Sequence, residues 1–302
     1  MSTPAVVSSD ALPTLELREF SVSSAGATWG ASLSLQTRAR RVGLVGDWAP
    51  LLQLLTGRAQ AASGRARILD GELQAAISAG ILGFAACDVP LPSSFTVLEY
   101  LQHAARLSHG SAKRATQDAQ RALERYGLVE LGKRKLAQLV LYQQRALGIA
   151  LATLTAPPVV CLENPLRGLD APAADYITRL CGEAAAHARV IVSAALPASP
   201  SPERTLLDGC EELFLVKQGQ LVAQGAPSEL FAVGARYAIS VKGRNISEFS
   251  RALSAAGVRL EARARSGSFD VELPKDTSTD LLLDAALEHG LIVLELEPML
   301  VS

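Results

Sequence analysis

The stretch of sequence that decides the fold reads Val159-Val160-Cys161-Leu162-Glu163-Asn164-Pro165-Leu166-Arg167-Gly168-Leu169-Asp170. Its first four residues form a short apolar run, which is typical of a strand buried on both faces. Glu163 and Asn164 then place an acid and an amide at the carboxyl end of that strand, where open α/β sheets bind their ligands. Pro165 and Gly168 predict the end of the strand and the start of a turn. The stretch therefore predicts an α/β protein with a site at a strand end.

Similar apolar runs recur along the chain and are separated by segments with helical periodicity. Together they indicate a parallel sheet with crossover helices, and the runs lie at residues 42–46, 81–84, 190–192 and 213–216. Apolar and polar side chains alternate in two earlier stretches, which predicts half-buried antiparallel strands at residues 15–22 and 31–36. Residues 97–136 carry a strongly helical pattern.

The pattern changes after about residue 234. Strand and helix patterns then follow in the order β-α-β-β-α-β, the order of a small ferredoxin-like module, at residues 237–241, 246–256, 258–263, 269–273, 279–289 and 291–296. We therefore expect a separate α+β domain at residues 235–302 and a main domain at 14–234. Residues 1–13 are small, polar and Pro-containing, which predicts a disordered N-terminal segment.

The composition limits the classes of protein that the chain can represent. With 302 residues, 49% of them hydrophobic, the chain can bury a sizeable core, and its net charge of -1 argues against a whole-chain nucleic-acid binder. The four cysteines form no CxxC pair and the four histidines form no cluster, so we expect reduced thiols and no metal site. No signal peptide is visible, and Pro157-Pro158 interrupts the longest apolar stretch. We therefore expect a cytoplasmic protein that reaches a membrane only through a partner.

The stretch from Val159 to Asp170 resembles the Walker B and D-loop segment of the ABC-transporter ATPases. That segment usually reads four apolar residues, Asp, Glu, Pro and then Gly-Leu-Asp. The resemblance extends over roughly residues 15–230, with the motifs in the right order and at close to the right spacing. It implies the P-loop NTPase-like fold of these ATPases: a parallel core sheet, an antiparallel β-subdomain and a helical subdomain at about residues 97–145.

The phosphate-binding loop of this family has no intact counterpart in the chain. A Walker A loop needs glycines that let backbone N–H groups wrap the phosphates, a Lys, and a Ser or Thr for Mg²⁺. The corresponding residues after Gly46 begin Asp47-Trp48-Ala49-Pro50, several residues are missing, and no Lys is present. Asp47 would place negative charge near the phosphate position, and Trp48 would add bulk. Since Pro50 suits the first turn of a helix, we expect a strand, a tight turn and a helix without a nucleotide.

The other catalytic motifs are also altered. Against the family pattern, Cys87 stands where the Q-loop Gln is expected, Tyr142 closes the signature motif without its Ser and glycines, and Ala195 replaces the switch His. Glu163 replaces the Walker B Asp, and Asn164 replaces the catalytic Glu. An amide cannot act as a general base near neutral pH. Because phosphoryl transfer depends on these groups together, we expect a catalytically dead relative of the ABC ATPases.

Two segments keep the family pattern. The D-loop residues Gly168, Leu169 and Asp170 are intact, and they serve either as a plain turn or as contacts at a dimer seam. The region that faces the permease in the family is retained at Phe95, Thr96, Glu99 and Tyr100. We therefore expect a structural or regulatory subunit of an ABC transporter complex. Its partners would be an ABC-type permease and possibly a second, competent ABC ATPase, with no cofactor and no nucleic acid.

Two alternatives remain open at this stage. In the first, the chain binds Mg-ATP weakly through a rearranged loop and hydrolyses it slowly, with Glu163 as the metal ligand. Its discriminating feature is a Lys or Arg that reaches the vacated phosphate position from elsewhere, and Arg40 and Arg41 are nearest in sequence. In the second, it is a free-standing scaffold whose C-terminal domain binds a protein or a regulatory ligand.

Overall fold

The computed structural model describes residues 12–24, 27–56, 58–88, 91–197, 201–231, 236–274 and 277–299. By its internal contacts the chain divides into two compact units, residues 1–195 with 209–224 and residues 196–208 with 225–302. The expected domain boundary at residue 234 and residues 1–11 of the expected disordered segment lie outside the described residues. Leu12 is described, and its carbonyl accepts a hydrogen bond of 2.8 Å from Arg189.

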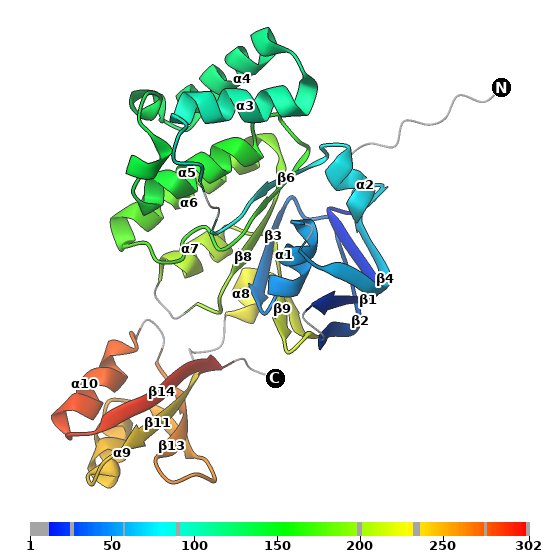
Figure 1. The fold of residues 1–302 in the computed structure, drawn as a ribbon. Helices are drawn as coiled ribbons and strands as arrows, with labels where there is room; N and C mark the ends of the chain where they lie inside the picture. The colour runs from blue at the N-terminus through cyan, green and yellow to red at the C-terminus, as the bar shows by residue number, and fades with distance from the viewer. Residues whose placement is uncertain are drawn as a thin grey trace. The chain divides into compact units, whose positions relative to one another are not determined.

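A six-stranded sheet forms the centre of the first unit (Figure 1), and its strand order is β10-β9-β3-β8-β7-β6. Adjacent strands from β9 to β6 are parallel, as the short apolar runs predict. The bounds are β3 Arg41–Gly46, β6 Leu82–Ala85, β7 Val159–Leu162, β8 Arg189–Ala194, β9 Glu212–Lys217 and β10 Gln220–Gly225. The strands β7 and β8 are buried along their whole length, which explains why their sequences do not alternate. The α/β prediction is confirmed.

A second, antiparallel sheet with strand order β2-β1-β4-β5 belongs to the same unit. Its strands are β1 Leu15–Ser24, β2 Ala27–Thr37, β4 Gln60–Ile68 and β5 Gly71–Glu72. The predicted pair of alternating strands corresponds to β1 and β2. The sequence analysis missed β4, because six of its nine residues are exposed and leave no apolar pattern. Apolar residues of this sheet share one core with α1 Ala49–Leu55, α2 Leu73–Ser78 and the central sheet.

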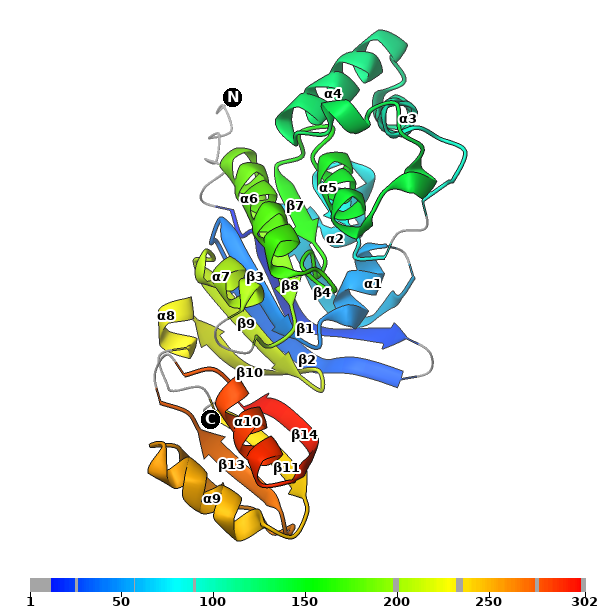
Figure 2. The same cartoon turned by 90° about the vertical axis from the view of Figure 1, so that its left-hand side faces the viewer.

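The helices of the first unit cover the central sheet and extend beyond it. Their bounds are α3 Val97–His109, α4 Ala112–Arg125, α5 Leu141–Ala152 and α6 Ala171–His187, with short 3-10 turns at Val129–Leu131 and Leu136–Gln138. The helices α3 and α4 pack on each other, and α5 contacts β6, β7 and α6; Figure 2 shows α5 and α6 beside the strands. The predicted helical subdomain is therefore present. Across the described residues, none of the helices combines the length and apolar character that a membrane span requires.

The C-terminal part of the second unit follows the predicted order β-α-β-β-α-β. The elements are β11 Arg236–Lys242, α9 Ile246–Ala255, β12 Arg259–Ala262, β13 Ser268–Glu272, α10 Asp280–Glu288 and β14 Ile292–Met299. The strand order β12-β13-β11-β14 is antiparallel throughout. Both helices contribute to a separate apolar core, for example through Phe249 and Leu282, which are fully buried. The ferredoxin-like prediction is confirmed. The same unit contains α7 Pro202–Asp208 and α8 Pro227–Leu230.

Two glycines of the first unit provide a matched test of this packing. A Cβ at Gly83 of β6 would lie 1.8 Å from the carbonyl oxygen of Ala152, whereas a Cβ at Gly182 in the middle of α6 meets nothing within 4 Å. We expect Gly83→Ala to destabilise the protein by about 3 kcal/mol through overpacking against a backbone. Gly182→Ala should stabilise it by about 1 kcal/mol through helix propensity. Urea unfolding measures both, and equal effects would contradict the packing of β6 against α5.

Candidate functional site

The turn between β3 and α1 occupies the position of a phosphate-binding loop. Gly46 has a φ of 93°, and a Cβ there would lie 2.3 Å from the carbonyl oxygen of Val216 on β9, so only glycine fits. The backbone N–H of Asp47 donates to the same Val216 carbonyl at 3.0 Å. The N–H of Trp48 donates to the carbonyl of Gly46 at 3.0 Å. Both N–H groups are therefore engaged by the chain's own carbonyls and are not presented to a phosphate.

The side chain of Trp48 fills the space behind this turn. It is 1% exposed. Its Nε1 donates to the carbonyls of Val45 at 3.1 Å and Phe214 at 3.2 Å, and its ring lies 5.7 Å from that of Trp29. The helix that follows has seven residues and carries Pro in its first turn, as expected from Pro50. Thus the turn is a packed structural element, in which Asp47 is exposed and Trp48 belongs to the core.

The carboxyl ends of β6 and β7 bring Cys87 and Glu163 together. The two strands pair in parallel, with Ala85 opposite Leu162, so the residues that follow them meet at one edge. The backbone N–H of Cys87 donates to Glu163 Oε2 at 3.1 Å, and the Cys87 Sγ lies 3.5 Å from the carbonyl oxygen of Asn164. The acid at the end of β7 is therefore held by the segment that corresponds to the Q-loop.

Asn164 is held in place by hydrogen bonds of its backbone N–H. Its φ of 39° lies in the left-handed region, which Asn tolerates better than most residues. Its N–H donates to the backbone carbonyl of Ser193 at 3.1 Å and to the hydroxyl of Ser193 at 3.0 Å. Ala195 follows β8 and is exposed, and its methyl side chain can neither donate nor accept a proton. The structure thus shows no proton acceptor at either of these two positions.

Two arginines and an aspartate complete the charge distribution, and the sequence analysis did not single them out. Arg167 forms an ion pair with Asp88, while a terminal nitrogen of Arg145 lies 3.6 Å from Asp88 Oδ1 and also donates to the carbonyl of Arg167. Arg145 is 8% exposed. Burial raises the pKa of the Cys87 thiol, although both arginines act in the opposite direction. Cys87 is therefore held mainly as a neutral thiol.

This donor set does not fit the Mg²⁺ that accompanies nucleotides in the fold family. Mg²⁺ prefers several oxygen ligands, usually carboxylates, water and phosphates. Glu163 accepts the N–H of Cys87, Asp88 is paired with the arginines, and the described residues contain no group of three His, Cys, Asp or Glu arranged to hold a metal. A cation would also meet the positive charge of Arg145 and Arg167.

Arg40 and Arg41, the arginines nearest in sequence to the phosphate position, do not take the place of the missing lysine. They lie at the amino end of β3, whereas Gly46 ends the strand, roughly 17 Å away at the rise of an extended chain. The backbone N–H of Arg40 donates to Glu211 Oε2 at 2.9 Å, and the side-chain Nε of Arg41 lies 3.8 Å from Glu211 Oε1.

The D-loop residues form a turn that ends in a helix cap. Gly168 has a φ of 78°, the N–H of Leu169 donates to the Leu166 carbonyl at 3.1 Å, and Asp170 Oδ1 accepts from the N–H of Ala173 at 3.0 Å as the N-cap of α6. These bonds account for the turn role of the three residues. A contact role at a dimer seam stays a prediction.

The position of the signature motif presents an apolar surface. Val140 is 53%, Leu141 37% and Tyr142 38% exposed at the start of α5. The ring of Tyr142 packs edge-on against Tyr176 at 5.8 Å. We call Val140, Leu141 and Tyr142 the signature patch. A cavity of about 370 Å³ lies beside it and is lined by Leu141, Arg145 and Cys87 among others.

The permease-contact candidates surround the start of α3. Thr96 is its N-cap: its hydroxyl accepts from the N–H of Glu99 at 3.2 Å, and Glu99 Oε2 accepts from the N–H of Thr96 at 2.7 Å. That hydrogen bond lowers the pKa of Glu99. The ring of Phe95 lies 6.0 Å from Tyr100 and 5.6 Å from His103, a residue that the sequence analysis missed. The candidates thus comprise a capping pair and a partly exposed aromatic cluster.

Comparison with solved structures defines the class of fold. Neither a protein-family model nor a curated protein matches the sequence. The structure of cbiO1 from Clostridium perfringens, described as part of the ABC transporter complex cbiONQ, matches with a TM-score of 0.62 at 19% identity, over 82% of this chain and 98% of that one. An ATP-binding subunit of an ABC transporter matches with a TM-score of 0.60 at 16% identity, over 72% and 91%. The chain therefore has the fold of the ATP-binding subunits of ABC transporters.

The packing of Trp48 can be tested by substitution. We expect Trp48→Ala to lower the free energy of unfolding by about 3–5 kcal/mol, because it leaves a cavity in the core behind the turn. Trp48→Phe keeps most of the apolar volume but leaves the Val45 and Phe214 carbonyls without their donor, which should cost about 1–3 kcal/mol. Urea unfolding monitored by circular dichroism gives both values. A negligible loss for Trp48→Ala would contradict a structural turn.

Proposed function

We propose that the protein is a catalytically inactive, ABC-type nucleotide-binding-domain-like subunit. The observation that carries this proposal is the β3–α1 turn. Its N–H groups are bonded to Val216 and Gly46, and Trp48 fills the space behind it. A phosphate bound there would have to replace these bonds, and no lysine stands in the turn to offset the loss.

The chemistry of the strand ends supports the same proposal. Hydrolysis of a bound nucleotide needs an oriented water, a metal ion and stabilisation of the charge that develops on the transferred phosphoryl group. Asn164 offers an amide in place of a base, Glu163 is bonded to the N–H of Cys87, and Ala195 has no polar side chain. The general base, the metal ligand and the polar side chain at the switch position are thus each absent or occupied. Their combined absence argues against slow hydrolysis as well as against fast hydrolysis.

In this proposal the retained surfaces serve assembly. The chain would lie on the inner face of a membrane through an ABC-type permease, contacted at the aromatic cluster of Phe95, Tyr100 and His103. A second, competent ABC ATPase would face the signature patch. The description of cbiO1 as part of an ABC transporter complex supports a permease partner. The exposed apolar side chains at the signature position support a protein contact, since this position no longer has the Ser and glycines that would face a nucleotide.

Calorimetric titration of Mg-ATP and Mg-ADP into the full-length protein tests the inactive-subunit proposal. We expect no binding at millimolar nucleotide, because the turn offers neither free N–H groups nor a cation. A competent ABC ATPase in the same buffer is the positive control. Saturable micromolar binding to the wild-type chain would overturn the proposal.

One observation favours weak nucleotide binding as a second candidate function. Arg145 lines the cavity of about 370 Å³, and Arg167 is paired with Asp88, another residue of its lining, so both guanidinium groups are available to phosphate oxygens under this candidate. Because Arg167 is 59% exposed, Arg167→Gln should leave the fold intact. Micromolar binding of Mg-ATP that is lost in Arg167→Gln would select this candidate over the inactive subunit.

The signature patch provides the test of assembly. We expect the wild-type chain, tagged and purified from its native cells, to bring down an ABC ATPase or an ABC permease. The double variant Val140→Ser with Tyr142→Ser should weaken the contact with the second ATPase by about 2 kcal/mol, the scale of an aromatic hot spot.

Val129→Ser is the matched control for this experiment, since Val129 is 48% exposed on the same subdomain but lies outside the patch. It should leave the recovery of both partners unchanged. Recovery of neither an ABC ATPase nor a permease with the wild-type chain would refute the assembly role.

A further inference from the structure

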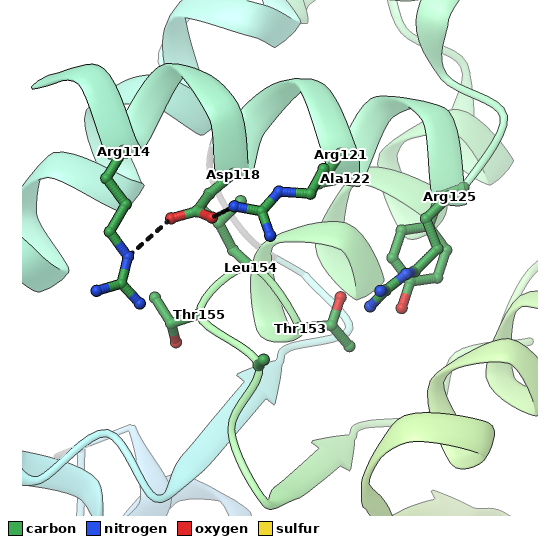
Figure 3. A pocket seen from close by; sticks show the side chains of 10 residues that line it. Arg114, Asp118, Arg121, Ala122, Arg125, Thr153, Leu154 and Thr155 are labelled. Carbon is green, nitrogen blue, oxygen red and sulfur yellow. Dashed lines mark hydrogen bonds and ion pairs between the residues drawn. The ribbon is translucent and has the colours of Figure 1, made fainter.

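A small basic pocket lies between α4 and the segment that follows α5, and it shares no residue with the candidate functional site. Its volume is about 140 Å³. Figure 3 shows four charged side chains projecting from one side of α4 towards the 153–155 segment: Arg114, Asp118, Arg121 and Arg125. The spacing along the helix places these residues on one face. Tyr126, directly after α4, also lines the pocket.

The charges in this pocket do not cancel. Arg121 lies 2.7 Å from Asp118 Oδ1, and Arg114 Nε lies 3.7 Å from Asp118 Oδ2, so one carboxylate is shared by two guanidinium groups. Arg125 has no carboxylate within ion-pair distance among the residues that the structure describes. Three guanidinium groups and one carboxylate line the pocket, so its lining carries a net charge of +2, and Glu183 is a further carboxylate near Tyr126. The pocket is therefore electrostatically suited to a dianion.

The hydroxyl of Tyr126 is a second and independent feature of the pocket. Tyr126 is 1% exposed, and within the described part of the chain its hydroxyl completes no hydrogen bond. Thr153 and Arg125 lie close to it, and the Thr153 hydroxyl, which donates to the carbonyl of Ile149 at 3.0 Å, forms no hydrogen bond with it. Burial raises the pKa of Tyr126, so it stays a protonated donor at neutral pH. A buried donor without an acceptor is unfavourable, and a bound oxyanion would supply that acceptor.

We propose that this pocket binds a phosphate group, with Arg121, Arg125 and the Tyr126 hydroxyl as donors. Guanidinium groups match the geometry of phosphate oxygens and form strong charge-assisted bonds with them. Asp118 limits the choice of anion, since a carboxylate repels an anion that carries no proton. Hydrogen phosphate has a P–OH that can donate to a carboxylate, whereas sulfate has none at neutral pH. The group is either free hydrogen phosphate or the end of a phosphomonoester in its singly protonated form, because the dianion of a monoester has no P–OH.

Calorimetric titration of the full-length protein at pH 7.5 and low ionic strength tests this site. Inorganic phosphate, glycerol phosphate and sulfate are the three ligands. We expect one phosphate-binding site per chain, weaker binding of sulfate, and a loss of affinity as salt screens the arginines. Binding of inorganic phosphate alone would identify the free anion as the ligand, and binding of glycerol phosphate would identify a phosphomonoester.

Three variants locate the site. Arg125→Gln should weaken phosphate binding about 10-fold or more, the scale of one charge-assisted hydrogen bond. Tyr126→Phe removes only the hydroxyl. Because a neutral donor contributes less than a charged one, we expect phosphate binding to weaken about 3- to 10-fold. Arg106→Gln is the matched control, because Arg106 is an exposed arginine of α3 that does not line the pocket. Thermal unfolding of each variant establishes that it is folded.

No binding of any of the three ligands at millimolar concentration would overturn the proposal. So would phosphate binding that Arg125→Gln and Tyr126→Phe leave unchanged, or an equal loss in Arg106→Gln. The site is independent of the proposed function: a nucleotide held only by its terminal phosphate in this pocket would lose its binding in Arg125→Gln but not in Arg167→Gln. Hence either proposal can fail without the other.

Discussion

The contact of the β3–α1 turn with β9 is the constraint on which the site depends. Gly46 approaches the Val216 carbonyl so closely that no Cβ fits, and the Asp47 N–H bonds to that same carbonyl. The turn is thereby fixed against a strand of the central sheet and continues directly into α1. Trp48 then packs behind it and bonds to Phe214 of the same strand. A loop that wraps phosphates would need its N–H groups pointing outwards, and this turn directs them to its own sheet.

The charged groups at the strand ends also interact with one another, as the N–H groups of the turn bond to the chain's own carbonyls. In a nucleotide site, carboxylates face a metal ion and arginines or lysines face phosphates. Here the groups compensate one another, because Asp88 meets Arg145 and Arg167, and Glu163 accepts the N–H of Cys87. Arg145 is almost completely buried, and a buried charge is tolerated when it is paired. The charges at the strand ends are thus paired, although Arg145 Nε is buried without a hydrogen-bond partner among the described residues, whereas net positive charge remains in the lining of the basic pocket at α4.

The sequence predicted those features that leave a local pattern. Apolar runs located the parallel strands, and periodicity located the ferredoxin-like domain, because burial on one or both faces dictates residue type position by position. The strand β4 left no such pattern, since it is largely exposed and is held by its pairing with β1. Asp88 and Arg145 are far apart in sequence and meet only after folding, so no spacing rule could connect them. Arg41 is near the phosphate position in sequence, but the length of β3 separates the two in space.

The separation between core and strand ends explains how the fold tolerates different residues at the strand ends. The core clusters consist of apolar side chains from strands and helices, whereas the positions that differ from the family pattern, apart from Tyr142 of α5, lie on the turns and loops at the carboxyl ends of the strands. Asp47 and Ala195 are exposed and contribute nothing to these clusters, whereas Trp48 belongs to the core. Stability therefore places little constraint on the identity of these loop residues. For such a chain, function has to be inferred from what the loops and surfaces now offer, which is an exposed apolar patch at α5 and net positive charge at α4.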